Sequence, residues 1–541
     1  MPGMNYADVW EAIAEVQPDA PAQIQGERLQ SWRDFDRRAD AVAADLLTLD
    51  GVTHQAKVAQ YLHNCTEYLE SLYAGWKVGL VPVNTNYRYA DDELVYLWDN
   101  ADAVAVVFHA TFTETIERIR DRVPRVERWY WVDDGAGEMP DWAVSYEEVA
   151  SRTVDRPTAP WARDGDDLYM LYTGGTTGMP KGVMWRQEDL FWLLNGGGLV
   201  PYPEGASLED AVAQRRAQGP GPKLLPACPL MHGTGALSSF GALQAGGCVV
   251  LLENRSFDAA ELFDLVERHG VNVLVIVGDA FAKPMLRALD ANPGKWDLSS
   301  VLVVLSSGVM WSEPVKQGLL KHHPSMILAD SLGSSEAVGM GSSASTGDAA
   351  AKTAKFNLGP NAVVVSEDGK LVEPGSGEIG RLGIKGRVPV GYYKDEAKTA
   401  ATFPTIDGIR YSLPGDFAQV EADGTITLLG RGSVCINTGG EKVFPEEVEE
   451  VLKLHPAIRD AVAVGVPDEK FGEAITAVVE PEPGAEVDAA DVIAHVKGKL
   501  AAYKAPKHVV VVDTIGRAPN AKVDYKRLKA LATERVGAGA S

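Results

Sequence analysis

Residues 172–182 read Tyr-Thr-Gly-Gly-Thr-Thr-Gly-Met-Pro-Lys-Gly, and this glycine loop decides how the rest of the chain is interpreted. Glycines let backbone N–H groups turn toward an anion, threonines supply hydroxyl donors, and Lys181 supplies a positive charge. The stretch lacks the Gly-Lys-Ser/Thr ending of the common P-loop, so it would hold a nucleotide in another way. A flexible turn between two strands explains the same residues equally well. The loop alone therefore leaves phosphate binding and a plain turn open.

The composition is that of a globular protein with several cores. A chain of 541 residues exceeds the ~150 residues typical of one domain, and 45% of its residues are hydrophobic. We find neither a long apolar run nor a basic start followed by an apolar segment. These features predict a cytoplasmic protein without stable membrane insertion. The formal charge of −24 argues against a nucleic-acid partner.

A parallel sheet is predicted in the middle of the chain. Apolar strand patterns at 248–252, 272–277 and 301–305 alternate with helical patterns at 258–269 and 280–289. Parallel sheets bind ligands beyond the carboxyl ends of their strands. Ser307 and Gly308 follow one such strand and residues 330–336 follow the next apolar segment, so both should open on one cleft edge. The first 160 residues also read as an α/β layer, without an evident catalytic constellation.

The last part of the chain reads as a separate unit. Short strands and glycine-rich turns beyond residue 344 predict a small β-rich subdomain, and a compact α+β unit follows it. We therefore predict an α/β fold with domains at 1–429 and 430–541, joined by a hinge near Ser433. A helix is expected at 185–194 and a surface insertion bordering a pocket at 200–223. The four cysteines lack metal-like spacing, which favours buried thiols.

Further motifs follow the glycine loop in a fixed order. They comprise Pro-Leu-Met-His-Gly-Thr-Gly at 229–235, Leu-Gly-Ser-Ser-Glu at 332–336, Pro-Gly-Asp at 414–416, the run from Gly430 to Glu449, and Lys522. Together they make the chain resemble the acyl-activating, adenylate-forming superfamily of acyl-CoA synthetases, peptide-synthetase adenylation domains and beetle luciferases. The resemblance covers nearly the whole chain. The run from Gly430 to Glu449 is most similar to bacterial fatty-acyl and steroid-side-chain CoA ligases.

The resemblance implies an ATP-dependent reaction in two halves. A carboxylate would attack the α-phosphorus of ATP to give acyl-AMP and pyrophosphate, and the thiol of coenzyme A would then displace AMP. Lys522 would offset the repulsion between carboxylate and α-phosphate, while the glycine loop holds the leaving pyrophosphate. The resemblance also implies a small domain that rotates between the two halves. It would first deliver Lys522 and then present Gly439-Gly440-Glu441 to the thiol.

Four side chains receive specific expectations, each with an alternative. Glu336, with Thr173, would hold the Mg²⁺ that accompanies ATP, or is a surface carboxylate. Asp416 would accept hydrogen bonds from both ribose hydroxyls, or stabilises its own turn. Arg431 would assist at the ribose, or is a surface charge beside the hinge. His232 would gate the junction of acyl pocket and thiol tunnel, or is a structural histidine.

The predicted contacts fall into three groups. Lys522, Thr173, Glu336 and His232 are the predicted catalytic residues. The nucleotide and coenzyme A contacts are Thr173, Gly174, Gly175, Thr176, Thr177, Lys181, Ser307, Gly308, Asp330, Ser331, Leu332, Gly333, Ser335, Asp416, Arg431, Gly439, Gly440, Glu441 and Lys442. His232, Gly278, Val309 and Val338 are the predicted substrate contacts. Gly174 and Leu332 depart from the usual serine and aromatic residue of the superfamily.

The candidate acyl pocket is apolar. Its other wall candidates are Trp185, Val277, Met310, Leu332 and Met340, which would otherwise be plain core. Because no Arg or Lys is placed to pair a second carboxylate, we expect a hydrophobic monocarboxylic acid: fatty, aryl or sterol-side-chain, with the last favoured. Two alternatives stay open, an adenylation enzyme that loads a carrier protein and a non-catalytic nucleotide-binding protein. Dimers are common in the superfamily, so a homodimer is compatible with this interpretation.

Overall fold

The computed structural model describes residues 3–173, 179–309, 311–347, 354–438, 441–468, 472–518 and 522–539. Several predicted contacts lie outside these residues: Gly174, Gly175, Thr176, Thr177, Met310, Gly439 and Gly440. The side chains of Ser433, Glu441 and Lys442 are likewise outside the description. Among the described residues, no helix is long and apolar enough to cross a membrane.

The first layer is a mainly parallel sheet whose strands come from residues 57–186, with one short strand added from residues 391–392. Its eight described strands run in the order β19-β9-β8-β4-β3-β5-β6-β7. The strands are β3 (Lys57–Tyr61), β4 (Val81–Asn84), β5 (Ala103–His109), β6 (Arg128–Val132), β7 (Val144–Ser145), β8 (Leu168–Thr173), β9 (Lys181–Arg186) and β19 (Gly391–Tyr392). The helices that precede or connect them are α1 (Tyr6–Val16), α2 (Trp32–Leu46), α3 (Thr66–Lys77), α4 (Asp91–Asn100), α5 (Thr113–Ile119), α6 (Tyr146–Ala150) and α7 (Gln187–Gly196).

The second layer confirms the predicted βαβ units. From β1 to β14 its strands pair in parallel in the order β1-β11-β10-β12-β13-β14, and the sheet then turns antiparallel through β15, β16, β22, β21, β18 and β17. The parallel strands are β1 (Pro21–Gln25), β10 (Lys223–Pro226), β11 (Cys248–Leu251), β12 (Val273–Ile276), β13 (Val303–Ser307) and β14 (Ile327–Ser334), with β2 (Arg28–Ser31) at the edge. The antiparallel strands are β15 (Ala337–Ser345), β16 (Lys355–Leu358), β17 (Ala362–Val365), β18 (Ile379–Lys385), β20 (Thr405–Ile406), β21 (Ile409–Val420) and β22 (Thr425–Arg431). Its helices are α8 (Leu208–Gln218), α9 (Gly233–Gln244), α10 (Ala259–His269), α11 (Asp279–Ala291), α12 (Glu313–His322) and α13 (Glu396–Thr402).

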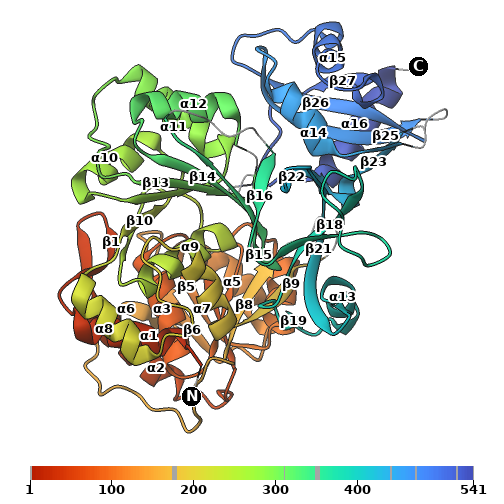
Figure 1. The fold of residues 1–541 in the computed structure, drawn as a ribbon. Helices are drawn as coiled ribbons and strands as arrows, with labels where there is room; N and C mark the ends of the chain where they lie inside the picture. Colours follow the sequence, from red (N-terminus) through yellow and green to blue (C-terminus); the bar gives the residue numbers. More distant parts are fainter. Residues whose placement is uncertain are drawn as a thin grey trace.

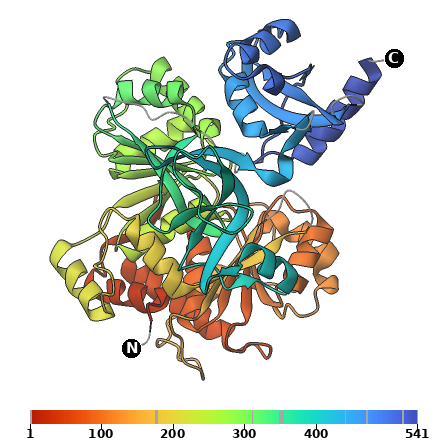
Figure 2. The same cartoon turned by 45° about the vertical axis from the view of Figure 1, so that its right-hand side comes forward.

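The C-terminal unit is a small sheet with helices, as the sequence predicts. It comprises β23 (Ile436–Thr438), β24 (Glu441–Val443), β25 (Ile458–Asp468), β26 (Gly472–Pro481), β27 (His508–Val511), α14 (Pro445–Lys453), α15 (Ala489–Lys497) and α16 (Tyr525–Gly539). This C-terminal unit, drawn in blue, stands apart from the two large layers and adjoins them at β22 (Figure 1). The turned view shows the same separation (Figure 2). The arrangement gives the unit its own core, which includes Val448, Ala463 and Val492.

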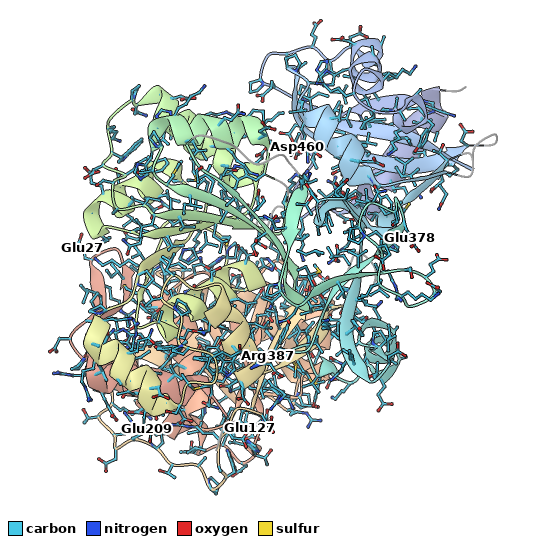
Figure 3. All side chains as sticks on the ribbon, viewed as in Figure 1. Glu27, Glu127, Glu209, Glu378, Arg387 and Asp460 are labelled. Atoms are coloured by element: carbon cyan, nitrogen blue, oxygen red, sulfur yellow. The ribbon has the colours of Figure 1, made fainter. Side chains whose placement is uncertain are left out.

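Charged side chains cover both the large layers and the C-terminal unit. Figure 3 labels the exposed carboxylates Glu27, Glu127, Glu209 and Glu378, which come from distant parts of the chain. This spread agrees with the net charge of −24.

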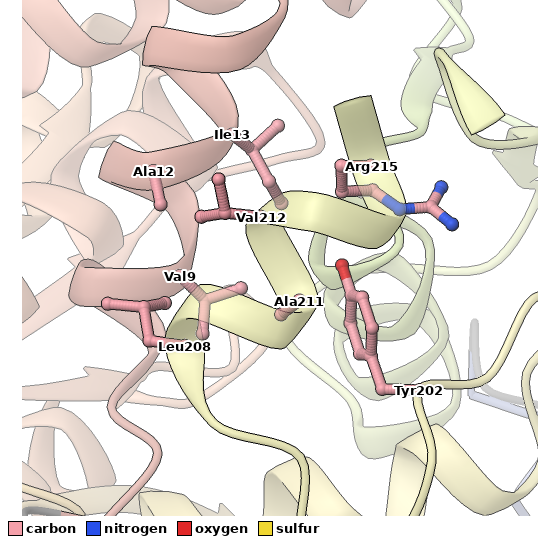
Figure 4. Close-up of a pocket in the computed structure, with 8 residues that line it drawn as sticks. All are labelled: Val9, Ala12, Ile13, Tyr202, Leu208, Ala211, Val212 and Arg215. Atoms are coloured by element: carbon pink, nitrogen blue, oxygen red, sulfur yellow. The ribbon is translucent and has the colours of Figure 1, made fainter. Parts of the chain in front are cut away.

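One sequence expectation needs correction. The helix predicted at 185–194 begins only at Gln187, because Lys181–Arg186 is strand β9, paired in antiparallel register with β8. The 200–223 insertion contains helix α8, which packs against α1 and leaves a narrow gap lined by residues of both (Figure 4). Figure 1 shows α8 at the lower left, away from β15 and β21.

Buried charge joins the first helices to one another. The ammonium of Lys77 lies 3.0 Å from Glu11 Oε1 and 2.7 Å from both Asp36 Oδ1 and Asp40 Oδ1, with its side chain 1% exposed. The three carboxylates are close enough together to hold a cation, and the lysine itself fills that role. Buried ions are tolerated only when paired in this way.

We expect Lys77→Met to lower the free energy of unfolding by about 3–5 kcal/mol, because it removes the fully buried cation shared by the three carboxylates and leaves them only the partly exposed Arg156 and Arg163. Urea denaturation measures the change. As the matched control, Lys370→Met removes an exposed lysine that pairs with exposed Asp368, and it should leave the denaturation midpoint unchanged. Similar losses in both variants would contradict this account of the Lys77 cluster.

Candidate active site

The two described ends of the glycine loop are held side by side by a hairpin. Thr173 ends β8, Lys181 begins β9, and the two residues are direct partners across the antiparallel pair. The amide of Asn84, 3% exposed at the carboxyl end of β4, accepts the Tyr172 N–H at 2.6 Å and donates to the Tyr172 carbonyl at 2.9 Å. It also donates to the Met231 carbonyl at 2.7 Å. Asn84 therefore joins the glycine loop to the segment that carries His232.

Sequence reasoning missed Asn84. We saw no catalytic constellation in the first 160 residues, although a polar residue at the end of an apolar parallel strand is the signal that could have revealed it. Its importance depends on Tyr172 and Met231, which are far away in sequence and close only in the fold.

Lys181 faces an acidic side chain from a distant segment. Its ammonium pairs with Asp395, the residue that caps α13, and lies 5.7 Å from the ring centre of Tyr392. A phosphate ligand would compete with the Asp395 carboxylate for this cation.

His232 lies at the N-terminus of α9, where its imidazole is largely enclosed. Its Nε2 is buried and has no hydrogen-bond partner among the described residues. Burial and the charge of Lys522 lower the pKa of His232 to about 3, so the ring is neutral at physiological pH. A buried ring nitrogen without a protein partner does not fit the alternative of a satisfied structural histidine, and it suits a residue that meets a ligand.

Glu336 sits in the tight turn between β14 and β15 and is held from three sides. The Tyr392 hydroxyl donates to its Oε1 at 2.9 Å, and the Ser412 hydroxyl donates to its backbone carbonyl at 2.6 Å. The indole N–H of Trp185 donates to the neighbouring Ser335 carbonyl at 2.8 Å. Only 9% of Glu336 is exposed, so it is not the surface carboxylate of the alternative reading.

Asp416 and Arg431 meet across β21 and β22. They are register partners, and the Arg431 Nε donates to Asp416 Oδ1 at 3.3 Å. The second oxygen, Asp416 Oδ2, is buried with no partner among the described residues. Burial raises the pKa of Asp416, while Arg431 opposes that shift. The orphaned oxygen is an acceptor of the kind that a ribose hydroxyl requires.

Lys522 reaches this group from the C-terminal unit. The side chain of Lys522 keeps contact with solvent, but protein atoms close by reduce the hydration of its ammonium. This loss of hydration and the positive charge of Arg431 lower the pKa of Lys522. Glu336 and Asp416 act in the opposite direction on the same ammonium. Lys522, although far from the glycine loop in sequence, is therefore close enough to interact electrostatically with Glu336, Asp416 and Arg431.

The junction of the two parts is tightly packed. Glu446, at the start of α14, accepts the Arg431 N–H at 3.4 Å, and a Cβ on Gly430 would lie 2.0 Å from its Oε2. Gly430 also has a φ of +110°, which other residues rarely adopt. Burial and Glu449 raise the pKa of Glu446 to about 8. Any movement of the C-terminal unit would have to release this carboxyl from the Gly430–Arg431 backbone.

The remaining predicted contacts lie on or near β13, β14 and the start of α9, and not all of their side chains are free to meet a ligand. Asp330 directs its carboxylate to the buried Lys316 of α12, so that side chain forms a buried ion pair. A Cβ on Gly308 would lie 3.8 Å from both Thr234 and Val277, which places it near the start of α9. The Gly278 N–H donates to Ser306 at 2.9 Å. Ser307 ends β13, while Ser331, Leu332 and Gly333 are half-buried along β14.

The candidate acyl wall divides into core and partly buried residues. Trp185, Val277 and Met340 are fully enclosed and belong to the hydrophobic cores, as their alternative reading holds. Leu332, Val338 and Val309 are only partly buried and pack against these cores. The partly buried residues are the ones left to contact an acyl group.

The donor set fits a magnesium nucleotide. Glu336 offers a carboxylate and Thr173 a hydroxyl, which are the oxygen ligands that Mg²⁺ prefers. Asp416 Oδ2, which has no partner within the ranges that the structure describes, adds an acceptor suited to the sugar.

Comparison with known proteins agrees with this geometry. Residues 10–393 match the family model described as AMP-binding enzyme, and residues 447–522 match that of the AMP-binding enzyme C-terminal domain. The chain is 40% identical over 533 residues to the 3-oxocholest-4-en-26-oate–CoA ligase of Rhodococcus rhodochrous, covering 97% of this chain and 95% of that protein. It is 39% identical to the medium/long-chain-fatty-acid–CoA/3-oxocholest-4-en-26-oate–CoA ligase of Mycolicibacterium smegmatis, covering 98% and 97%.

A solved structure shares the fold along the full length. The anthranilate CoA ligase AuaEII in complex with anthranoyl-AMP superposes with a TM-score of 0.82 at 20% identity, covering 99% of each chain. At this identity the likeness concerns the fold alone. The family models, the relatives and the gathered motif residues together lead to one assignment. The chain belongs to the AMP-binding enzyme family, within the acyl-activating, adenylate-forming superfamily, as an acyl-CoA synthetase.

Proposed function

We propose that this acyl-CoA synthetase activates a hydrophobic monocarboxylic acid, a sterol-side-chain acid or a medium- to long-chain fatty acid, with ATP, Mg²⁺ and coenzyme A. The observation that carries the proposal is the meeting of Glu336, Asp416 and Arg431 with Lys522 from the C-terminal unit. The names of the two relatives support the acid class. The partly buried Leu332, Val338 and Val309 supply apolar contacts for such an acid.

In the first half-reaction the chain would act through position and charge. Asp416 Oδ2 would accept hydrogen bonds from the ribose, with Arg431 keeping that carboxylate ionised. Glu336 and Thr173 would hold Mg²⁺, which supplies charge neutralisation on the phosphates. Lys181 would leave Asp395 for the pyrophosphate portion. Lys522 would lie between the acid's carboxylate and the α-phosphate, where it offsets the repulsion of two anions as they approach.

The second half-reaction would require a different wall. With the hinge near Ser433 between domains 1–429 and 430–541, rotation would withdraw Lys522 and bring residues 439–442 toward the thiol. The thiolate sulfur would attack the acyl carbonyl carbon, the carbon–oxygen bond to AMP would break, and AMP would leave with the electron pair. His232, whose Nε2 has no partner among the residues that the structure describes, lies near Lys522 and would mark the boundary where acyl group and thiol meet.

A panel of acids tests the substrate class. We expect sterol-side-chain and medium- to long-chain fatty acids to release AMP and form thioesters, and dicarboxylic acids to fail because the apolar wall leaves a second carboxylate unpaired. Mass spectrometry of thioesters measures the outcome. AMP release that does not depend on coenzyme A would indicate a carrier-protein acceptor instead. Absence of carboxylate-dependent pyrophosphate exchange across the whole panel would refute the proposal.

Lys522→Ala separates the two halves of the reaction. Because only adenylation uses the ammonium, we expect acyl-AMP formation to fall by about 10²–10³-fold, while thioester formation from supplied acyl-AMP is retained. Single-turnover assays measure each half. Lys526→Ala, which removes an exposed lysine four residues away, should change neither half. Equal losses in both halves for Lys522→Ala would contradict its assigned role.

A further inference from the structure

Tyr392 connects two parts of the site that the motifs treat separately. It lies on β19, a two-residue strand that pairs with β9, the strand that begins at Lys181. The flanking backbone bonds are short: Val390 N–H to the Met184 carbonyl at 2.8 Å and Tyr393 N–H to the Gly182 carbonyl at 2.8 Å. Tyr392 is therefore fixed relative to the end of the glycine loop.

The hydroxyl of Tyr392 points at the predicted metal ligand. It donates to Glu336 Oε1 at 2.9 Å, and the side chain of buried Thr402 in α13 forms a further hydrogen bond with it. A tyrosine hydroxyl carries its proton at physiological pH, and a carboxylate oxygen only accepts, so Tyr392 is the donor in this bond. A donor on Oε1 fixes the rotation of the carboxylate and directs its second oxygen elsewhere.

The same short segment also holds the cation of the glycine loop. Asp395, three residues beyond Tyr392, pairs with Lys181, whose ammonium lies 5.7 Å from the Tyr392 ring centre. Tyr392 bonds the carboxylate of Glu336 and Asp395 pairs with the ammonium of Lys181, so two nearby side chains of one segment hold both groups. The Trp185–Ser335 bond is a second link between β9 and the turn that carries Glu336.

We propose that Tyr392 is a positioning residue, which orients Glu336 for Mg²⁺ and keeps that metal ligand in register with the glycine loop. This inference rests on the proposed role of Glu336. A hydrogen-bonded partner that orients a metal-binding carboxylate contributes about 10–100-fold to metal affinity. Tyr392 would contribute in this way without touching nucleotide or acid.

The chain offers a matched control in the adjacent residue. The Tyr393 hydroxyl donates to Asp102 Oδ2 at 2.7 Å, so Tyr393→Phe removes the same kind of tyrosine–carboxylate bond at a carboxylate outside the site. Tyr392→Phe keeps the ring that packs 5.4 Å from Phe403, and it deletes only the hydroxyl. Melting without ligand reports whether each variant folds.

The test measures metal-dependent nucleotide binding without turnover. Calorimetry with a non-hydrolysable ATP analogue is run across a series of Mg²⁺ concentrations, and thermal melting with ATP is compared in Mg²⁺ and in chelator. We expect Tyr392→Phe to require about tenfold more Mg²⁺ for half-maximal binding and to lose most of the Mg²⁺-dependent rise in melting temperature. Tyr393→Phe should match the wild type in both measurements.

Two results would overturn the inference: unchanged Mg²⁺ dependence in Tyr392→Phe, or equal weakening in both tyrosine variants. If Tyr392→Phe does not fold, Thr402→Val, which removes the bond to the Tyr392 hydroxyl, is judged by the same measurements. A higher Mg²⁺ requirement in that variant supports the inference, and an unchanged one rejects it. If the wild type itself shows no Mg²⁺-dependent gain with ATP, the proposed metal site fails, which is a different outcome.

Discussion

The enclosure of two carboxylates, Glu336 and Asp416, is the constraint on which the site depends. Each is 9% exposed, and burial together with the charge of Glu336 raises the pKa of Asp416. Arg431 and Lys522 supply the opposing charge, one from β22 and one from the C-terminal unit. The position of the C-terminal unit therefore affects the net charge around Glu336 and Asp416, because withdrawing Lys522 would remove one of the two positive charges near these carboxylates.

The antiparallel half of the second sheet is what brings these charges together. The turn between β14 and β15 carries Glu336, while β21 and β22 carry Asp416 and Arg431 as register partners. The Ser412 hydroxyl bonds the Glu336 carbonyl and so links β21 to the turn. Ladder hydrogen bonds fix these strands, which positions the carboxylates before any ligand arrives, and a preorganised site gives up less free energy on binding.

The first sheet positions the two ends of the glycine loop. The Asn84 amide holds both the strand that enters the loop and the segment before His232. β19, contributed by a segment more than 200 residues further along the chain, closes the other side of β9. The loop ends are thus held by two elements that are absent from the loop's own sequence.

Sequence by itself determined the chemistry and the local elements. The Gly/Thr composition of residues 172–182, the alternation of strands and helices at 248–305 and the separate unit after Gly430 depend on short-range pattern, which survives without knowledge of the fold. The same short-range reasoning misplaced the start of α7, because pairing of β9 with β8 overrides helical spacing at Trp185. The nucleotide contact of Asp330 stays a prediction, and the structure adds that its carboxylate pairs with buried Lys316.

Only the tertiary structure decided which polar atoms have partners. Asp416 Oδ2 and His232 Nε2 are buried and have no hydrogen-bond partner in the described part of the chain, and a sequence pattern carries no information about burial at that scale. Asn84 and Tyr392 form side-chain hydrogen bonds of 2.6–2.9 Å with residues that are distant in sequence, and these bonds define their positions. Sequence motifs identify the residues that contact a ligand. The residues that hold those motifs in place can be identified only from the fold, because their contacts join segments that are distant in sequence.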